Sequence, residues 1–265
     1  MAYSHLDRAY DIAVARMEMV APDLDSGGET AANALLVFVW YQRALGLWHL
    51  LARLDSSAYR ACLARSGYAQ LELLMLKRGN PALSGQTCCG SKVVGLASAL
   101  AAGDLDIARK VALAMPTDHD PDWEYEDDFL FVTFLAKALL GASDEELGAL
   151  LARWAVVTDG QLPAGAQACE MIVGRDQGAW PAAIRGYLEE RAASLEAGRT
   201  SLTAQPETMA TEGTVSMNGL ALLRIAELRG LRTDEELPLC PRVAQLRPIT
   251  GASPGSDWRK VLERA

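Results

Sequence analysis

The densest group of chemically active side chains is an acidic and aromatic segment between Thr117 and Leu130. It contains seven carboxylates, three aromatic residues and no lysine or arginine: Asp118, Asp120, Asp122, Trp123, Glu124, Tyr125, Glu126, Asp127, Asp128 and Phe129. Carboxylates at such short spacing repel one another. The first turn of a helix offsets this repulsion only in part, through its free amides and its dipole. More charge is present than a helix start needs.

Three interpretations fit this segment. The first is a solvated acidic helix start. The second is a contact surface, on which aromatic residues supply buried area and acids steer a basic partner. The third is a divalent-metal site made of clustered carboxylates. We rank the metal site below the contact surface, because the segment lacks the spacing and glycine of a calcium loop. No second acidic cluster is evident to complete an octahedral site either.

A second segment, GQTCCGSK at 85–92, has the glycines and lysine of a phosphate-binding loop but not their order. Such a loop needs Gly, four residues and then Gly-Lys-Ser/Thr after a strand. Here the lysine is displaced and no strand precedes it. We interpret 85–92 as a turn that leads into the apolar helix after Lys92, and we exclude nucleotide binding.

Histidines and cysteines form no catalytic or metal-binding pattern. The three histidines stand in no HExxH, HxH or Ser-His-Asp setting. The five cysteines are odd in number and scattered, without a CxxC pair, so free thiols are expected. Adjacent Cys88 and Cys89 are interpreted as small apolar residues near a helix start. The sequence thus predicts a protein without catalytic residues, cofactor or metal.

Helices are predicted to carry all of these segments. Apolar residues recur at helical spacing between start and stop signals, whereas strand-like alternation with hairpin turns is missing. The clearest signals are the stop at Gly79 and Pro81, the N-cap at Asp104, the capping box from Ser143 and Pro181 in a first turn. We predict one all-α domain over 1–265, a compact bundle of about eight to twelve helices in antiparallel hairpins with no significant sheet.

Three other stretches have distinct predicted structures. The apolar stretch 31–54 is interrupted by Gln42, Arg43 and His49, which predicts a buried helix and not a transmembrane one. The stretch 198–214 is rich in Thr, Gly and Glu and predicts a long surface loop. The tail 248–265 is predicted to be a loop followed by a short terminal helix.

Charge and the amino-terminal sequence limit the choice of partners and compartment. The net charge of −9 argues against nucleic-acid binding, which rests on neutralising phosphates with Lys and Arg, and favours basic partners. The first residues carry charges throughout and lack a secretory pattern, so a cytoplasmic protein is expected without membrane attachment.

Three stretches of the sequence resemble the immunity 49 family of bacterial polymorphic-toxin immunity proteins. They are WEYEDDFLFVTFLAKALL from Trp123, RDQGAWPAAIRGYLEERAASLEAG from Arg175, and SMNGLALLRIAELRGL from Ser216, which leads to LPLCPRVAQL. The resemblance covers roughly residues 122–246. The first half of the chain matches only in its helical, apolar character.

The resemblance implies an all-helical protein that binds the effector domain of a secreted toxin and blocks it. Residues 125–128 match the acidic element of the family. We infer that the charged and aromatic residues at 118, 120 and 122–128 are candidates for the toxin interface, against a basic toxin such as a nuclease. The alternatives are a helical-hairpin scaffold or adaptor protein and a carboxylate-rich metal hydrolase, although the Glu-x-x-His pairs of the latter are missing.

Overall fold

A computed structural model of the chain describes residues 4–199, 206–245 and 258–259. These residues form thirteen α-helices and two short 3₁₀ helices without a strand, apart from one isolated bridge between Leu237 and Cys240. The helices are α1 (His5–Val20), η1 (Ala21–Asp25), α2 (Gly28–Arg53), α3 (Ser56–Gly79), α4 (Gly85–Cys88), η2 (Gly90–Lys92), α5 (Val94–Ala102), α6 (Leu105–Ala114), α7 (Glu126–Leu139), α8 (Asp144–Val157), α9 (Ala164–Gly174), α10 (Trp180–Gly198), α11 (Pro206–Ala210), α12 (Met217–Leu228) and α13 (Arg242–Gln245).

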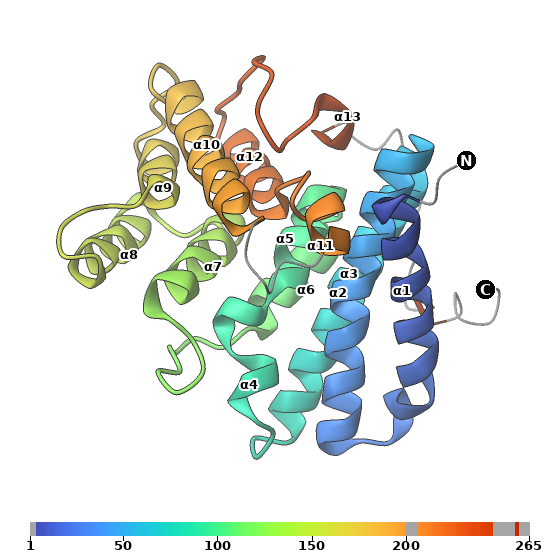
Figure 1. Ribbon diagram of the computed structural model, residues 1–265. Helices are drawn as coiled ribbons and strands as arrows, with labels where there is room; N and C mark the ends of the chain where they lie inside the picture. Colours follow the sequence, from blue (N-terminus) through green and yellow to red (C-terminus); the bar gives the residue numbers. More distant parts are fainter. Residues whose placement is uncertain (1–3, 200–205, 246–257, 260–265) are drawn as a thin grey trace.

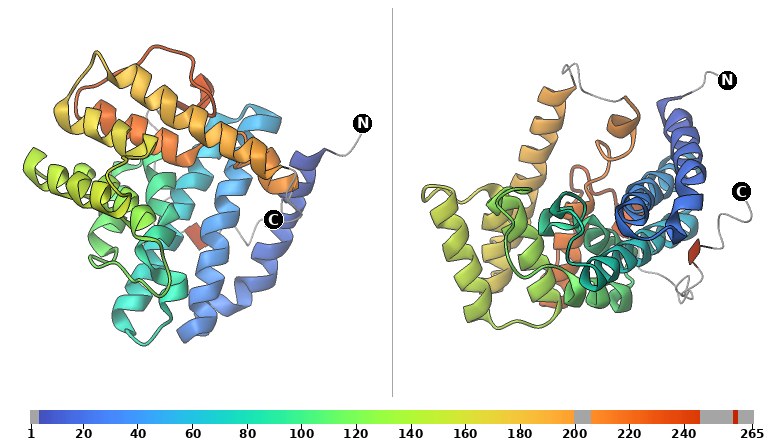
Figure 2. Two further views of the ribbon diagram at one scale, coloured as in Figure 1. Left: turned by 60° about the vertical axis from the view of Figure 1, so that its left-hand side comes forward. Right: turned by 90° about the horizontal axis from the view of Figure 1, so that it is seen from below.

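The helices form an array that runs from α1 at one side to α8, α9 and α10 at the other (Figure 1). The long helices α1, α2 and α3 pack side by side, and α5 and α6 pack against α3. Helix α12 lies in the middle and contacts α5, α7, α9 and α10. The view from below separates the blue α1–α3 side from the yellow and orange α8–α10 side (Figure 2).

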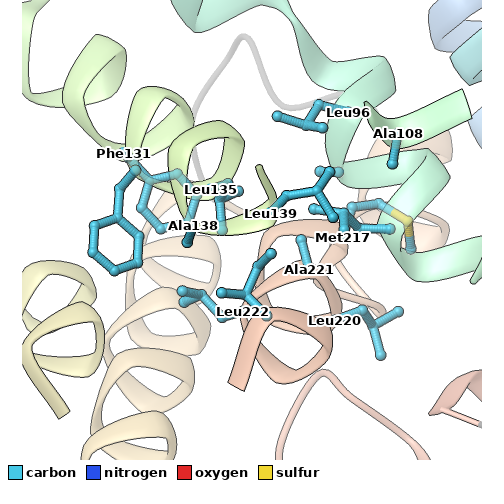
Figure 3. Close-up of a cluster of buried hydrophobic side chains, with 14 of the residues drawn as sticks. Leu96, Ala108, Phe131, Leu135, Ala138, Leu139, Met217, Leu220, Ala221 and Leu222 are labelled. Atoms are coloured by element: carbon cyan, nitrogen blue, oxygen red, sulfur yellow. The ribbon is translucent and has the colours of Figure 1, made fainter. Parts of the chain in front are cut away.

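Buried apolar side chains form two clusters, both of which include residues of α3. Leu63 and Leu74 of α3 belong to the larger cluster, whereas Cys62 and Leu73 belong to the cluster around α1 and α2. Figure 3 shows part of the larger cluster, in which side chains of α7 and α12 face one another beside Leu96 of α5. The core is therefore continuous through α3.

The predicted all-α class is confirmed, as are the main helix boundaries. Helix α3 ends at Gly79, α6 starts after Asp104, whose side chain accepts from the Ile107 amide at 3.2 Å, and α8 starts with the Ser143 capping box. The number of helices exceeds the predicted eight to twelve. The excess comes from α4, α11 and α13, which have five residues or fewer.

The prediction of a surface loop over 198–214 is wrong in part. Helix α11 lies within this stretch, and Thr211 is buried with 2% of its surface exposed. Glu212 accepts a hydrogen bond at 2.7 Å from Arg43, whose side chain is 6% exposed. The partner on α2 lies 169 positions earlier, so no local sequence signal could predict the pairing.

Helix α2 is the most apolar of the long helices. By length and composition alone it could cross a membrane, a test that core helices also pass. In the structure it packs between α1 and α3 and buries Leu35, Phe38 and Leu47, among others. The prediction of a helix buried in the core is confirmed.

Most of the predicted tail, 248–257 and 260–265, lies outside the described residues. Trp258 is buried, with 5% of its surface exposed, and its ring meets that of Phe38 edge-on at 5.6 Å. Arg259 pairs with Asp25 at 2.6 Å and also with Glu72. Residues 258 and 259 therefore lie against the helices of the amino-terminal side.

Candidate protein-binding surface

The acidic and aromatic segment runs from the loop after α6 into the first turn of α7. Tyr125 is the N-cap residue of α7 and makes no side-chain capping bond. Glu126, Asp127 and Asp128 occupy the first turn instead. Their charges complement the positive end of the helix dipole, which explains why acids are tolerated there.

Glu124 ties this segment to the 3₁₀ helix η2. Its Oε2 accepts from the Ser91 amide at 2.5 Å, and its Oε1 accepts from the Asp120 amide at 3.1 Å. Its backbone oxygen lies 3.0 Å from Nε2 of the His119 ring. A carboxylate that accepts two backbone hydrogen bonds is a structural group, because leaving those amides unpaired would destabilise the turn.

Two glycines of the 85–92 segment allow this close packing. A Cβ atom at Gly85 would lie 2.4 Å from Oδ2 of Asp120 and 2.5 Å from Cδ1 of Trp123. A Cβ atom at Gly90 would lie 2.5 Å from Cδ2 of Phe129. The glycines that resemble a phosphate loop in the sequence therefore make room for the acidic and aromatic segment, consistent with the predicted turn.

Glu126 has an ionic partner on the next helix. Arg153 of α8 donates its Nε–H to Oε1 of Glu126 at 2.5 Å, and its guanidinium lies 5.9 Å from the centre of the Phe129 ring. This pair is half-exposed, so its contribution to stability is small. Its main effect is to remove one negative charge from the outer surface.

Six other residues of the segment form what we call the acidic-aromatic surface: Asp118, Asp122, Trp123, Tyr125, Asp127 and Asp128. Tyr125 is 80% exposed and Trp123 is 46% exposed. Among the described residues the four aspartates have no ion-pair partner within 4 Å. The surface thus combines large exposed rings with unneutralised charge.

The pKa of the Asp128 carboxyl is raised above its ordinary value. Partial burial is the main cause, and the charges of Asp127 and Glu124 add to it, whereas Arg191 lowers the pKa. Holding Asp128 ionised at neutral pH therefore opposes folding. The ionised Asp128 carboxylate thus lowers the stability of the isolated protein.

The structure divides the nine candidate interface residues into two groups. Asp120, Glu124 and Glu126 are engaged within the protein; Oδ1 of Asp120 accepts from the Asp122 amide at 3.2 Å. Of the other six, five are exposed, whereas Asp127 is half-buried and its Oδ1 accepts from the Asp128 amide at 3.0 Å. The sequence could not make this division, because Ser91 and Arg153 are 33 and 27 positions from their partners.

Metal and thiol chemistry have no visible site in the described part of the chain. No group of three or more His, Cys, Asp or Glu side chains there is placed to hold a metal ion. All five cysteines are free and buried. Burial raises the pKa of Cys88 and Cys89, in agreement with their interpretation as small apolar residues.

Comparisons with protein-family models, curated proteins and solved structures gave no match. The resemblance to the immunity 49 family therefore rests on the three sequence stretches alone.

Proposed function

We propose that this protein binds a toxin protein through the acidic-aromatic surface and neutralises it, acting in the cytoplasm as a binding protein and not as an enzyme. The observation that carries the proposal is the exposure of Trp123 and Tyr125 among four aspartates without ion-pair partners in the described structure. Trp and Tyr are the residues most often found at the centres of protein interfaces.

The contacts that hold the acidic-aromatic surface in place support this function. Glu124 joins the segment to η2, and Gly85 and Gly90 let the two loops pack closely. A surface that is ordered before binding loses less conformational entropy in the complex, so more of the contact energy appears as affinity. The segment therefore has the rigidity that tight inhibition requires.

The charge of the surface supports a basic partner. The chain has a net charge of −9, and the four aspartates add a local negative field. Such a field accelerates encounter with a positive surface. A nuclease toxin fits this description, because its substrate groove must be positive to bind phosphates. An acidic surface in that groove would exclude the substrate.

The test uses the toxin domain encoded by the neighbouring open reading frame. The double variant Trp123→Ala/Tyr125→Ala should remain folded and lose about 2–4 kcal/mol of binding free energy, with loss of protection when the toxin is expressed in cells. The matched control is Trp40→Ala, which removes another exposed ring, on α2, where Trp40 is 42% exposed.

Unchanged affinity of the double variant would refute binding through this surface. Failure of the unmodified protein to bind the neighbouring domain would refute the immunity function itself. In that case the helical-hairpin adaptor becomes the better interpretation.

A further inference from the structure

Residues 206–214, which we call the strap, lie between α10 and α12 in the chain but contact the other side of the array. The strap contains α11, which packs against α1. In both views of Figure 2 the orange α11 lies next to the blue α1. The strap therefore links the carboxyl-terminal helices to the amino-terminal side.

Short-range hydrogen bonds give the strap its shape. The amides of Thr211 and Gly213 donate to the Thr208 carbonyl at 3.3 and 3.0 Å. A Cβ atom at Gly213 would lie 2.6 Å from the carbonyl oxygen of Met209, so this turn requires glycine. A helix as short as α11, which has five residues, is not stable by itself in water. The hydrogen bonds of the strap therefore depend on its contact with the helices beneath it.

An ion pair joins the strap to α2. Nη2 of Arg43 donates to Oε2 of Glu212 at 2.7 Å; the Arg43 side chain is buried and that of Glu212 is mostly buried. The guanidinium also lies 4.9 Å from the centre of the Trp40 ring. Docking of the strap therefore removes two charged groups from most of their water.

Three polar atoms at this contact are buried without a hydrogen-bond partner in the described structure. They are Nε of Arg43, Oε1 of Glu212 and the hydroxyl oxygen of Tyr59. Burial is the main cause that raises the pKa of Tyr59, and the nearby charge of Glu212 adds to it. The attraction between two buried charges offsets the loss of their hydration only when their remaining polar atoms are paired as well. The docked strap therefore gains little net stability from this ion pair.

The docked strap depends on both charges of this ion pair. Removing one partner leaves the other charge buried and unpaired, which destabilises more than the whole pair stabilises. Replacing both partners with apolar side chains of similar volume is often neutral or stabilising. Segments with few buried apolar contacts open at a lower free energy than the core does. The strap has the features of such a segment, because it is short and a buried ion pair holds it.

We propose that the strap undocks from α1 and α2 as a unit while the rest of the molecule stays folded, and that the Arg43–Glu212 ion pair is the latch that holds it. Undocking lets water reach both charges and the Tyr59 hydroxyl, which restores the hydration lost on docking. It releases the contact between α11 and α1, whereas the core, which is continuous through α3, stays intact. This motion does not depend on the proposed binding of a toxin.

Native-state hydrogen exchange of the full chain, read out by mass spectrometry of peptides, tests both parts of the proposal. After correction for intrinsic exchange rates, the strap amides of the unmodified protein should exchange about a hundredfold or more faster than buried amides in the middle of α2 and α3. This measurement needs no variant.

Variants of the ion pair test the latch. Glu212→Met and Arg43→Met each leave one charge unpaired and should speed exchange in the strap by a further factor of about ten or more. The double variant Arg43→Met/Glu212→Met should exchange more slowly there than either single variant. The matched control is Arg185→Met, which removes a half-exposed ion pair with Glu235 at 2.6 Å and should leave exchange in the strap unchanged.

Strap amides that are as well protected as those of α2 and α3 would overturn local undocking. Single variants that speed exchange in α5 and α7 as much as in the strap would also overturn it, because the ion pair would then stabilise the whole fold. A double variant that exchanges as fast as the faster single variant would show that the ion pair is not the latch.

Discussion

Glu124 and Asp128 are four positions apart, yet their carboxyl groups have opposite effects on stability. Glu124 accepts two backbone hydrogen bonds and holds a turn together. Asp128 is partly desolvated beside Asp127 and Glu124, which raises its pKa. Substitutions at the two positions should therefore change stability in opposite directions.

Replacing Glu124 with Gln should lower the free energy of unfolding by about 1–3 kcal/mol, because an uncharged amide cannot accept both backbone hydrogen bonds equally well. Denaturant unfolding of the variant measures the loss. The control is Asp122→Asn, since the carboxylate of Asp122 is exposed. Equal stability of the two variants would show that Glu124 does not hold the turn.

Replacing Asp128 with Asn should leave stability at neutral pH equal or slightly higher, within about 0.5 kcal/mol for such a surface position. The native-state pKa of Asp128 is raised above 3.8, so the native state holds this proton more tightly than the unfolded chain. The tighter binding of this proton in the native state therefore stabilises the protein below pH 3.8. This stabilisation is lost as the pH rises through the native-state pKa of Asp128.

Unfolding curves of Asp128→Asn and the parent at neutral pH and near pH 4 measure this dependence. Any excess in the free energy of unfolding of Asp128→Asn over the parent should shrink as the pH falls. An excess that grows at low pH would contradict the raised pKa of Asp128. Glu145→Gln, at an exposed acid in the first turn of α8, is the control for generic loss of charge.

At the scale of the helices, the sequence predicted those helix ends that are fixed by interactions between residues close together in the chain. The caps at Asp104 and Ser143 and the stop at Gly79 act within a few residues, so the sequence displays them. The packing of α11 and the return of Trp258 to α2 depend on residues more than a hundred positions away. Neither leaves a periodic or capping pattern that could be recognised in the sequence.

Replacing Trp258 with Ala tests whether the tail is part of the fold. Its ring is buried against Phe38, so the change should lower the free energy of unfolding by about 3–5 kcal/mol. Trp40→Ala, which removes a ring that is 42% exposed, should cost much less. Similar small losses for both variants would mean that Trp258 does not anchor the tail.

At the scale of the whole molecule, α12 connects the two ends of the array. It packs on α5 towards the amino-terminal side and on α9 and α10 at the other side. The acidic-aromatic surface ends in the first turn of α7, which also packs on this helix. The arrangement leaves the acidic-aromatic surface exposed at one end of α7.

The most direct test of the proposed function is the association rate with the neighbouring toxin domain at two ionic strengths. The test variant replaces Asp118, Asp122, Asp127 and Asp128 with Asn. The control variant removes the same number of charges at exposed glutamates elsewhere, by replacing Glu18, Glu145, Glu170 and Glu190 with Gln.

Steering by a local field is screened by salt over about 10 Å at 0.1 M, so it depends on where the charges lie and not only on their number. We predict that the parent and the control variant associate fast at low salt, with rates that fall steeply as salt increases. The test variant should associate about tenfold or more slowly at low salt, with a shallow dependence. Identical rates and salt dependence for all three proteins would contradict binding through the acidic-aromatic surface.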